Sequence, residues 1–121
     1  MGLPRAYRLT EKRQFDRVLK NRSLYVRNGP FRVYAVSNTA DRARLGLIIG
    51  RRQARRAVDQ NRIKRFLRET FRSQHDALPP YDVVVQLAEP HEGQAMLATT
   101  ANGLWSIFLE AHQEHTHTGD A

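Results

Sequence analysis

Arginine and lysine side chains are concentrated in one short segment of this sequence. Residues 51–72 hold nine cations but only two acids, Asp59 and Glu69. A guanidinium can donate two parallel hydrogen bonds to one phosphate group, so this composition suits the backbone of a nucleic acid. A solvated charged surface is the alternative interpretation, and the near absence of balancing acids argues against it. The nine cations are Arg51, Arg52, Arg55, Arg56, Arg62, Lys64, Arg65, Arg68 and Arg72.

The second part of this segment has the periodicity of an amphipathic helix over about residues 57–74. Apolar side chains recur at helical spacing from Ile63 to Phe71 and form one stripe. Asn61 adds an amide that can donate to a phosphate and accept from a 2′-hydroxyl. We therefore expect a nucleic-acid-binding helix, preceded by a loop with two Arg-Arg pairs. On a helical wheel, the side opposite the apolar stripe carries a basic ridge, which consists of Asn61, Arg65, Arg68 and Arg72 and is flanked by Arg62 and Lys64.

Side chains suited to catalysis or to metal binding are not grouped in this sequence. The absence of cysteine excludes a disulfide framework, a thiol nucleophile and a Cys-based metal site. No pair of carboxylates has a spacing typical of acid–base catalysis, and no glycine-rich phosphate loop occurs. His112, His115 and His117 could chelate a metal ion, but we interpret them as part of an incidental polar tail. The sequence therefore predicts no catalytic residue and no metal site in this chain.

The charge of the 121 residues is distributed unevenly along the chain. Residues 1–72 hold all twenty Lys and Arg with five acids, a net charge of +15, whereas residues 73–121 hold seven acids and no cation. This asymmetry indicates a polyanionic partner for the first part of the chain. Seventeen of the twenty cations are Arg, which favours a nucleic acid over a lipid surface. No apolar run approaches the ~20 residues that cross a bilayer, and no signal peptide is present, so we expect a cytoplasmic protein without a membrane partner.

Local patterns place these residues in a single domain built from helices and strands. Helices are predicted over about residues 10–20, 57–74 and 92–111, with strands over 31–36, 44–50 and 81–87 and a weaker strand near 24–27. This order predicts an α+β sandwich over residues 1–111, followed by a disordered polar tail over residues 112–121. The last helix is expected to bury Met96, Thr100, Leu104, Ile107, Phe108 and Ala111.

The basic segment also resembles the signature of the protein subunit of bacterial ribonuclease P. Residues 50–72 read GRRQARRAVDQNRIKRFLRETFR, and the family pattern is a paired-cation loop that leads into an Ala-Val-x-Arg-Asn-Arg-x-Lys-Arg-x-x-Arg-Glu helix. The likeness covers about residues 5–110 in order. One position departs from the pattern, because Gln60 stands where the family has the first Arg of its Arg-Asn-Arg triplet. Outside this segment the likeness rests on Leu9, Phe15 and Val18, on Phe31 and Tyr34, on Arg44-Leu45-Gly46-Leu47 and on Tyr81-Asp82-Val83-Val84-Val85.

The resemblance implies a fold and a role that the residues alone do not. The implied fold has a central, mostly antiparallel sheet and a left-handed β-α-β crossover, of a kind also found in a ribosomal protein domain, that carries the basic helix. The implied role is that of one protein chain bound to a ribonuclease P RNA, which uses magnesium to remove the 5′ leader from precursor tRNA. The loop and the basic helix would bind that RNA. The leader would lie in a cleft between the first helix and the sheet, at Phe15, Tyr34, Arg13, Arg17 and Arg32.

Other functions fit part of this pattern. A ribosomal or RNA-chaperone protein shares the charge but predicts no preference for tRNA that carries a leader. A DNA-binding protein would need a tight helix-turn-helix or a dimer interface, and a strand precedes the basic helix here, so no DNA partner is expected. An independent nuclease would need a cluster of acids. For the aromatic residues the alternative is core packing, which we favour for Phe31, whereas the resemblance assigns Phe15 and Tyr34 to leader stacking.

Overall fold

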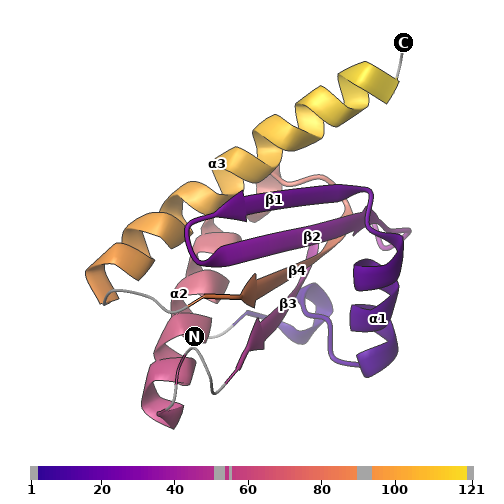
Figure 1. The fold of residues 1–121 in the computed structure, drawn as a ribbon. Coiled ribbons are helices and arrows are strands. Elements are labelled where there is room, and N and C mark those ends of the chain that lie inside the picture. Colours follow the sequence, from indigo (N-terminus) through magenta and orange to yellow (C-terminus); the bar gives the residue numbers. More distant parts are fainter. Residues whose placement is uncertain (1–2, 51–53, 55, 90–93, 120–121) are drawn as a thin grey trace.

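Four strands and three helices make up residues 3–50, 54, 56–89 and 94–119, the part of the chain that the computed structural model describes (Figure 1). They are α1 (Lys12–Asn21), β1 (Leu24–Asn28), β2 (Phe31–Ser37), β3 (Arg44–Ile49), α2 (Ala57–Gln74), β4 (Tyr81–Leu87) and α3 (Gln94–Gly119), with short 3-10 helices at Arg5–Tyr7 and His75–Ala77. The strand order across the sheet is β1-β2-β4-β3. β1 with β2 and β2 with β4 pair antiparallel, whereas β3 pairs parallel with β4. The α+β prediction and the mostly antiparallel sheet are confirmed.

Two elements have the bounds that the sequence predicts, and a third begins later. α2 spans Ala57–Gln74 and β4 spans Tyr81–Leu87. α1 starts after Glu11 rather than at Thr10, because Glu11 is its N-cap. The Glu11 side chain accepts a hydrogen bond from the backbone of Gln14, and the Gln14 side chain accepts one from the backbone N–H of Glu11 at 2.9 Å. This capping box satisfies two backbone donors at the helix start.

β1 and β2 form a hairpin. β1 is the strand that the sequence indicates only weakly near residues 24–27. Asn28 pairs with Phe31, which leaves Gly29 and Pro30 as a two-residue turn. Gly29 has a φ of 56°, a left-handed conformation that glycine adopts without a steric penalty. The turn fixes the register of the two strands and therefore decides which side chains share a face.

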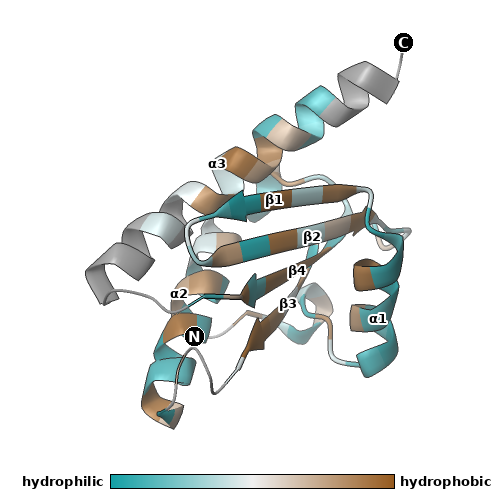
Figure 2. Ribbon diagram, viewed as in Figure 1, coloured by the Kyte–Doolittle hydropathy of each residue, from teal (hydrophilic) through white to brown (hydrophobic). Residues whose placement is uncertain are grey.

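Helices cover both faces of the sheet. α1 packs against β2 and β4 on one face, whereas α2 and α3 cover the other (Figure 1). Figure 2 shows the hydrophobic side of α1 turned toward the strands and its hydrophilic side turned outward. Because β4 is a central strand with both faces covered, Val83, Val84 and Val85 are all fully buried.

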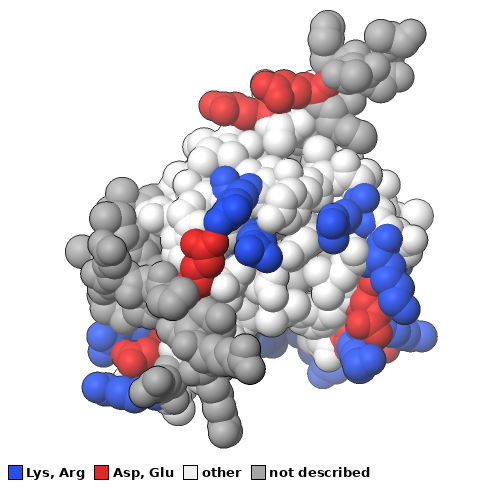
Figure 3. Space-filling view, viewed as in Figure 1, with Lys and Arg blue, Asp and Glu red and all other residues white. Residues whose placement is uncertain are grey.

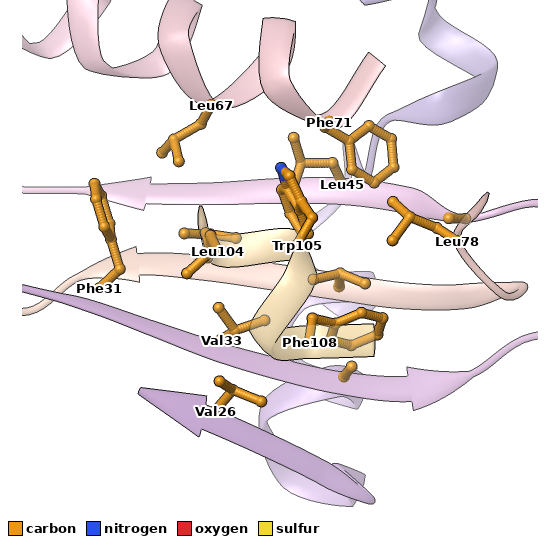
Figure 4. Packing of buried hydrophobic residues seen from close by; sticks show 14 of the residues in the cluster. Val26, Phe31, Val33, Leu45, Leu67, Phe71, Leu78, Leu104, Trp105 and Phe108 are labelled. Carbon is orange, nitrogen blue, oxygen red and sulfur yellow. The ribbon is translucent and has the colours of Figure 1, made fainter. Parts of the chain in front are cut away.

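The larger core lies between the sheet and the helices α2 and α3. Leu67 and Phe71 of α2 meet Trp105 and Phe108 of α3 over the strands (Figure 4). The Trp105 ring lies edge to face with that of Phe71 at 5.3 Å between centroids, and its Nε1 donates to Thr70 Oγ1 at 3.0 Å. The predicted buried side of the last helix omits Trp105, which is fully buried. Burial of an indole requires a partner for its N–H, and here that partner comes from another helix.

α3 extends past the end that the sequence predicts. The sequence places the end at Ala111 and a disordered tail over residues 112–121, whereas the helix continues to Gly119. The predicted end of the helix is therefore wrong, whereas the disorder of the tail stays a prediction, and residues 120–121 lie outside the described part. The His112 ring packs edge-on against that of Tyr81 at 5.2 Å, which gives this extension a tertiary contact. Although α3 has 26 residues, neither it nor another helix among the described residues is apolar enough to span a membrane.

α2 connects β3 to its parallel neighbour β4. This is the β-α-β unit that the family resemblance implies, and its left hand stays a prediction. α2 contacts β3 and α3, so it lies along the edge of the sheet where β3 ends the strand order. The crossover thus places one side of α2 on the core and leaves the other side of the helix exposed on the surface.

Candidate RNA-binding surface

The basic ridge lies on the side of α2 that faces away from the core. Ile63, Leu67 and Phe71 are at most 1% exposed and anchor the helix. None of the ridge cations from Arg62 to Arg72 forms a salt bridge with another described residue. Of the ridge residues, Asn61, Arg65 and Arg72 are exposed and Arg68 is half-buried, and of the two flanking cations Arg62 is exposed and Lys64 is half-buried. This charge is uncompensated among the described residues, which favours an anion-binding surface. Figure 3 shows acidic side chains on the far part of α3, at the top of the view.

The loop before α2 holds the remaining cations that the sequence assigns to RNA. Arg56 is exposed at the start of the helix, where its Nε lies 3.6 Å from the Asp59 carboxylate. Arg51, Arg52 and Arg55 lie outside the described residues. An exposed pair such as that of Arg56 contributes little to stability, so a phosphate could compete for this guanidinium.

Gln60 turns back toward the same loop. Its Nε2 donates to the backbone carbonyl of Ala54 at 2.8 Å, and the Ala54 N–H donates to the carbonyl of Gly50 at 3.1 Å. The amide therefore ties the end of the loop to the first turns of α2. At the position where the family pattern has Arg, this chain has a neutral side chain that is already bonded within the protein.

A further arginine reaches the ridge from the N-terminal segment. The backbone of Arg8 bridges that of Leu45 in β3, and the Arg8 Nε is buried without a hydrogen-bond partner. Burial, and then the nearby charge of Arg8, lower the pKa of Arg68. Neither guanidinium pairs with an acid among the described residues, so the repulsion between the two charges is not compensated there. Sequence patterns miss Arg8, because nothing local connects it with a helix that lies sixty residues further along the chain.

On the opposite face of the sheet, Phe15 projects from α1. The side chain is half-buried and packs in a small apolar cluster built around Val18 and Val84. Its ring lies directly over the backbone of Gly46 in β3. The ring is thus fixed against the strand, while the residue as a whole stays partly exposed.

Replacing Gly46 by alanine is expected to destabilise the protein by about 1–3 kcal/mol through overpacking. A Cβ at Gly46 would lie 2.6 Å from Phe15 Cε2 and 3.1 Å from Leu9 Cδ1, so α1 and β3 would have to separate. Gly103→Ala is the matched control, because a Cβ there meets nothing nearer than 3.9 Å and alanine favours a helix. Urea unfolding of both variants measures the difference. A Gly46 variant as stable as the Gly103 variant would contradict the close packing of Phe15 on the strand.

Tyr34 shares this face but is largely covered by its neighbours. It is 8% exposed, and its hydroxyl donates to Gln86 Oε1 at 2.9 Å. The Arg22 guanidinium lies 5.1 Å from the centre of the Tyr34 ring, and the Tyr25 ring lies 5.3 Å away. The exposed aromatic ring here is that of Tyr25, at 46%. The sequence analysis did not single out Tyr25, and the hairpin register is the signal that pairs it with Tyr34.

The three arginines assigned to the leader have different environments. Arg32 lies two residues before Tyr34 on the same face of β2, and its Nε is buried without a partner. Arg13 is 83% exposed, and its Nε lies 2.6 Å from the Glu11 carboxylate. Arg17 donates to the Ser37 carbonyl at 2.9 Å and is also engaged with a buried acid of β4. The structure thus brings Arg32 beside Tyr34, whereas Arg13 faces solvent and Arg17 joins α1 to the sheet.

That buried acid is Asp82, which is 1% exposed. Arg44 donates to its two oxygens from Nε and Nη2, each at 2.8 Å, Asn38 Nδ2 donates at 2.8 Å, and Arg17 Nη1 donates at 3.2 Å. The hydrogen bonding to Asp82 raises the pKa of Arg44, against the opposing effect of burial. One carboxylate therefore joins α1, β3 and β4. A lone acid within an apolar strand is the sequence signal for such a site, because unpaired carboxylates are rarely buried.

Candidate metal ligands are dispersed in this structure. Among the described residues, no three His, Asp or Glu side chains lie close enough together to hold a metal ion. His91 and the side chains of His115 and His117 lie outside the described part. The sequence-based expectation of no metal site thus stays a prediction.

The chain is similar over most of its length to proteins of one family. A family model described as Ribonuclease P matches residues 3–110. The ribonuclease P protein component of Halorhodospira halophila is 37% identical over 105 residues, 85% of this chain and 86% of that protein. That of Thioalkalivibrio sulfidiphilus is 45% identical over 84 residues, 69% of each. The structure of the Staphylococcus aureus RNase P protein is 27% identical, with a TM-score of 0.74 over 87% of this chain and 94% of that chain.

Proposed function

The chain belongs to the family of protein components of bacterial ribonuclease P, and from this premise we propose how it assists the RNA subunit. As the protein component of this endoribonuclease, it is an RNA-binding part of a ribonucleoprotein that acts in tRNA processing. We infer that the basic ridge binds phosphates of the ribonuclease P RNA and that the α1 face of the sheet binds the 5′ leader of precursor tRNA. The uncompensated charge of the ridge on α2 is the observation that carries this proposal.

The ridge suits an RNA backbone because its donors are preorganised along one rigid helix. Arg65 and Arg72 are exposed and lack salt-bridge partners among the described residues, so RNA need not displace an acid to reach them. Arg8 and Arg68 would hold one phosphate between two guanidiniums. Asn61, at the exposed start of the ridge, would contact a 2′-hydroxyl. The loop cations Arg51, Arg52 and Arg55 would extend the same contact toward the N-terminal end of α2.

The leader would lie on the face of the sheet that α1 covers only in part. Phe15 offers a half-buried ring for base stacking, and Arg32 offers a guanidinium without a salt-bridge partner among the described residues. Arg17 is held by Asp82, so its role in this proposal is to position α1 beside the strands. Tyr34 would contribute the edge of its ring and its bond to Gln86.

The bond-breaking chemistry belongs to the RNA in this proposal. Magnesium would act with the RNA, and this chain would bind and orient the two RNA partners without contributing a catalytic residue. One chain would act per RNA, in the cytoplasm. The family's left-handed crossover would set the angle between the ridge and the leader face.

Reconstitution tests the proposal directly. We expect the protein, mixed with a ribonuclease P RNA at low magnesium, to stimulate cleavage of precursor tRNA at its 5′ end and to favour precursor over mature tRNA. The protein alone should cleave nothing. Binding of the RNA without stimulated cleavage would instead indicate a ribosomal or RNA-chaperone function.

Phe15→Ala in the same assay tests the leader face. The variant holoenzyme is expected to lose about 1–3 kcal/mol of affinity for precursor tRNA and little for mature tRNA, because only the precursor has a leader to stack. Phe15→Leu, which keeps apolar volume against Gly46 but has no aromatic face, is the matched control for packing. Equal weakening of both tRNAs would show that Phe15 serves only as core.

A further inference from the structure

Tyr25 presents an exposed aromatic ring on the edge strand β1. Tyr25 is 46% exposed as a residue, and the hairpin register places it directly opposite Tyr34, on the face of the sheet that α1 covers. The Arg22 guanidinium lies 5.5 Å from the centre of the Tyr25 ring and 5.1 Å from that of Tyr34. We propose that Tyr25 and Arg22 form a further base-stacking position for the unpaired leader, an inference that rests on the proposed function.

Cross-strand pairing connects this position to Phe15 in one row. Tyr25 pairs with Tyr34, Tyr34 with Val84, and Val84 with Gly46, over which the Phe15 ring lies. The row therefore crosses all four strands, with an aromatic ring accessible at each end. Three strand spacings amount to about 14 Å. α1 covers Tyr34 and Val84 in the middle of the row, so a leader that reaches both rings passes beside α1 and needs at least about four nucleotides at about 3.4 Å per stacked nucleotide.

The chemistry of the Tyr25 end suits a nucleotide. An exposed ring offers a π-face to any base, and Arg22 adds a positive charge beside it for the adjoining phosphate. Arg22 has no salt-bridge partner among the described residues, and its hydrogen bond to the Leu19 carbonyl is long, at 3.4 Å. Arg32 lies on the same face and continues the positive charge along β2. The occupant that this surface favours is thus single-stranded and anionic.

A shielding role for Tyr25 makes a different prediction. If Tyr25 serves only to cover Tyr34, its removal should lower the stability of the protein. The contribution of the leader to the affinity for precursor tRNA should then stay unchanged. If Tyr25 stacks on the leader, its removal should weaken binding only of those precursor tRNAs whose leader is long enough to reach it. Leader length therefore separates the two roles.

The experiment uses the reconstituted holoenzyme and precursor tRNAs with leaders from about one to about ten nucleotides. Tyr25→Thr, which keeps a strand-favouring residue, is expected to weaken binding of the long-leader precursor about fivefold or more and to leave mature tRNA unchanged. Tyr25→Phe should bind like the unmodified protein, because the ring is kept. Arg22→Gln should weaken the long-leader complex and reduce its salt dependence. Urea unfolding of each variant accounts for any change in stability.

The affinity of the Phe15→Ala holoenzyme is measured in parallel as a function of leader length. This comparison separates the Tyr25 position from the proposed leader binding on which it rests. The two variants should begin to lose affinity at leader lengths that differ by about four nucleotides, because the rings lie at opposite ends of the row. Loss with Phe15→Ala and none with Tyr25→Thr would overturn the Tyr25 position and leave leader binding intact. No preference of the unmodified holoenzyme for precursor over mature tRNA would overturn the proposed leader binding itself.

Discussion

Asp82→Asn is expected to destabilise the free protein by about 3–5 kcal/mol. The carboxylate is 1% exposed and accepts hydrogen bonds from Arg17, Asn38 and Arg44. An amide keeps the size of the side chain but replaces one acceptor oxygen by a donor, so guanidinium groups are left facing a group that cannot neutralise them. Urea unfolding, followed by circular dichroism, measures the loss.

Asp16→Asn is the matched control for this substitution. Asp16 pairs with Lys12 on the surface of α1, with side chains 42% and 90% exposed, and such a pair contributes only about 0.3–0.5 kcal/mol. The two variants have the same change in charge and chemistry and differ in burial. Equal stability of the two variants would contradict a structural role for the Asp82 network.

Replacing Arg65 and Arg68 together by alanine is expected to weaken binding of the ribonuclease P RNA by about 2–4 kcal/mol at low salt. The slope of log affinity against log salt should fall by about one to two units, since each lost phosphate contact removes about 0.7–0.9. Folding should be little affected, because Arg65 is exposed and removal of the half-buried Arg68 relieves its repulsion with Arg8. Salt titrations of RNA binding and urea unfolding provide the two measurements.

The double variant Lys12→Ala with Lys20→Ala is the control for the Arg65 and Arg68 variant. It removes the same number of positive charges, but from α1. Both lysines are exposed and lie on the other face of the sheet from α2. A change in net charge alone would affect the two double variants equally. The ridge assignment predicts that the α2 variant loses far more affinity, and an unchanged salt slope in that variant would show that α2 does not face the RNA.

Elements governed by local patterns were predictable from the sequence. α2 has its expected bounds because a continuous apolar stripe specifies the helix, and a short 3-10 helix at His75–Ala77 follows its last residue before Leu78 and the prolines. The exposed side of that helix follows from the same periodicity, so the ridge on α2 was also predictable. The start of α1 was displaced because the reciprocal bonds of Glu11 and Gln14 outweigh the weaker cap at Thr10.

Features that depend on tertiary contacts were not predictable in this way. The charge of Arg8 acts on Arg68 of the ridge although sixty residues separate them, and the backbone bridge from Arg8 to Leu45 in β3 is what fixes the N-terminal segment against the sheet. Tyr25 becomes part of the leader face only through the register of the hairpin. Asp82 requires donors from three separate segments. In each case the partners are distant along the chain, and no spacing rule connects them.

The strand order has a consequence for the synthesis of this protein. β2 and β3 follow one another in the sequence but do not pair, because β4 lies between them. Until Tyr81–Leu87 emerges from the ribosome, β3 has no neighbour from the sheet and the Asp82 carboxylate does not yet exist to hold it. The ridge is translated before β4, which pairs with β3, and before α3, which packs on α2, so a nascent chain displays its cations on a helix that lacks this support. Specific RNA assembly therefore follows completion of β4, and earlier encounters with RNA are expected to be electrostatic and nonspecific.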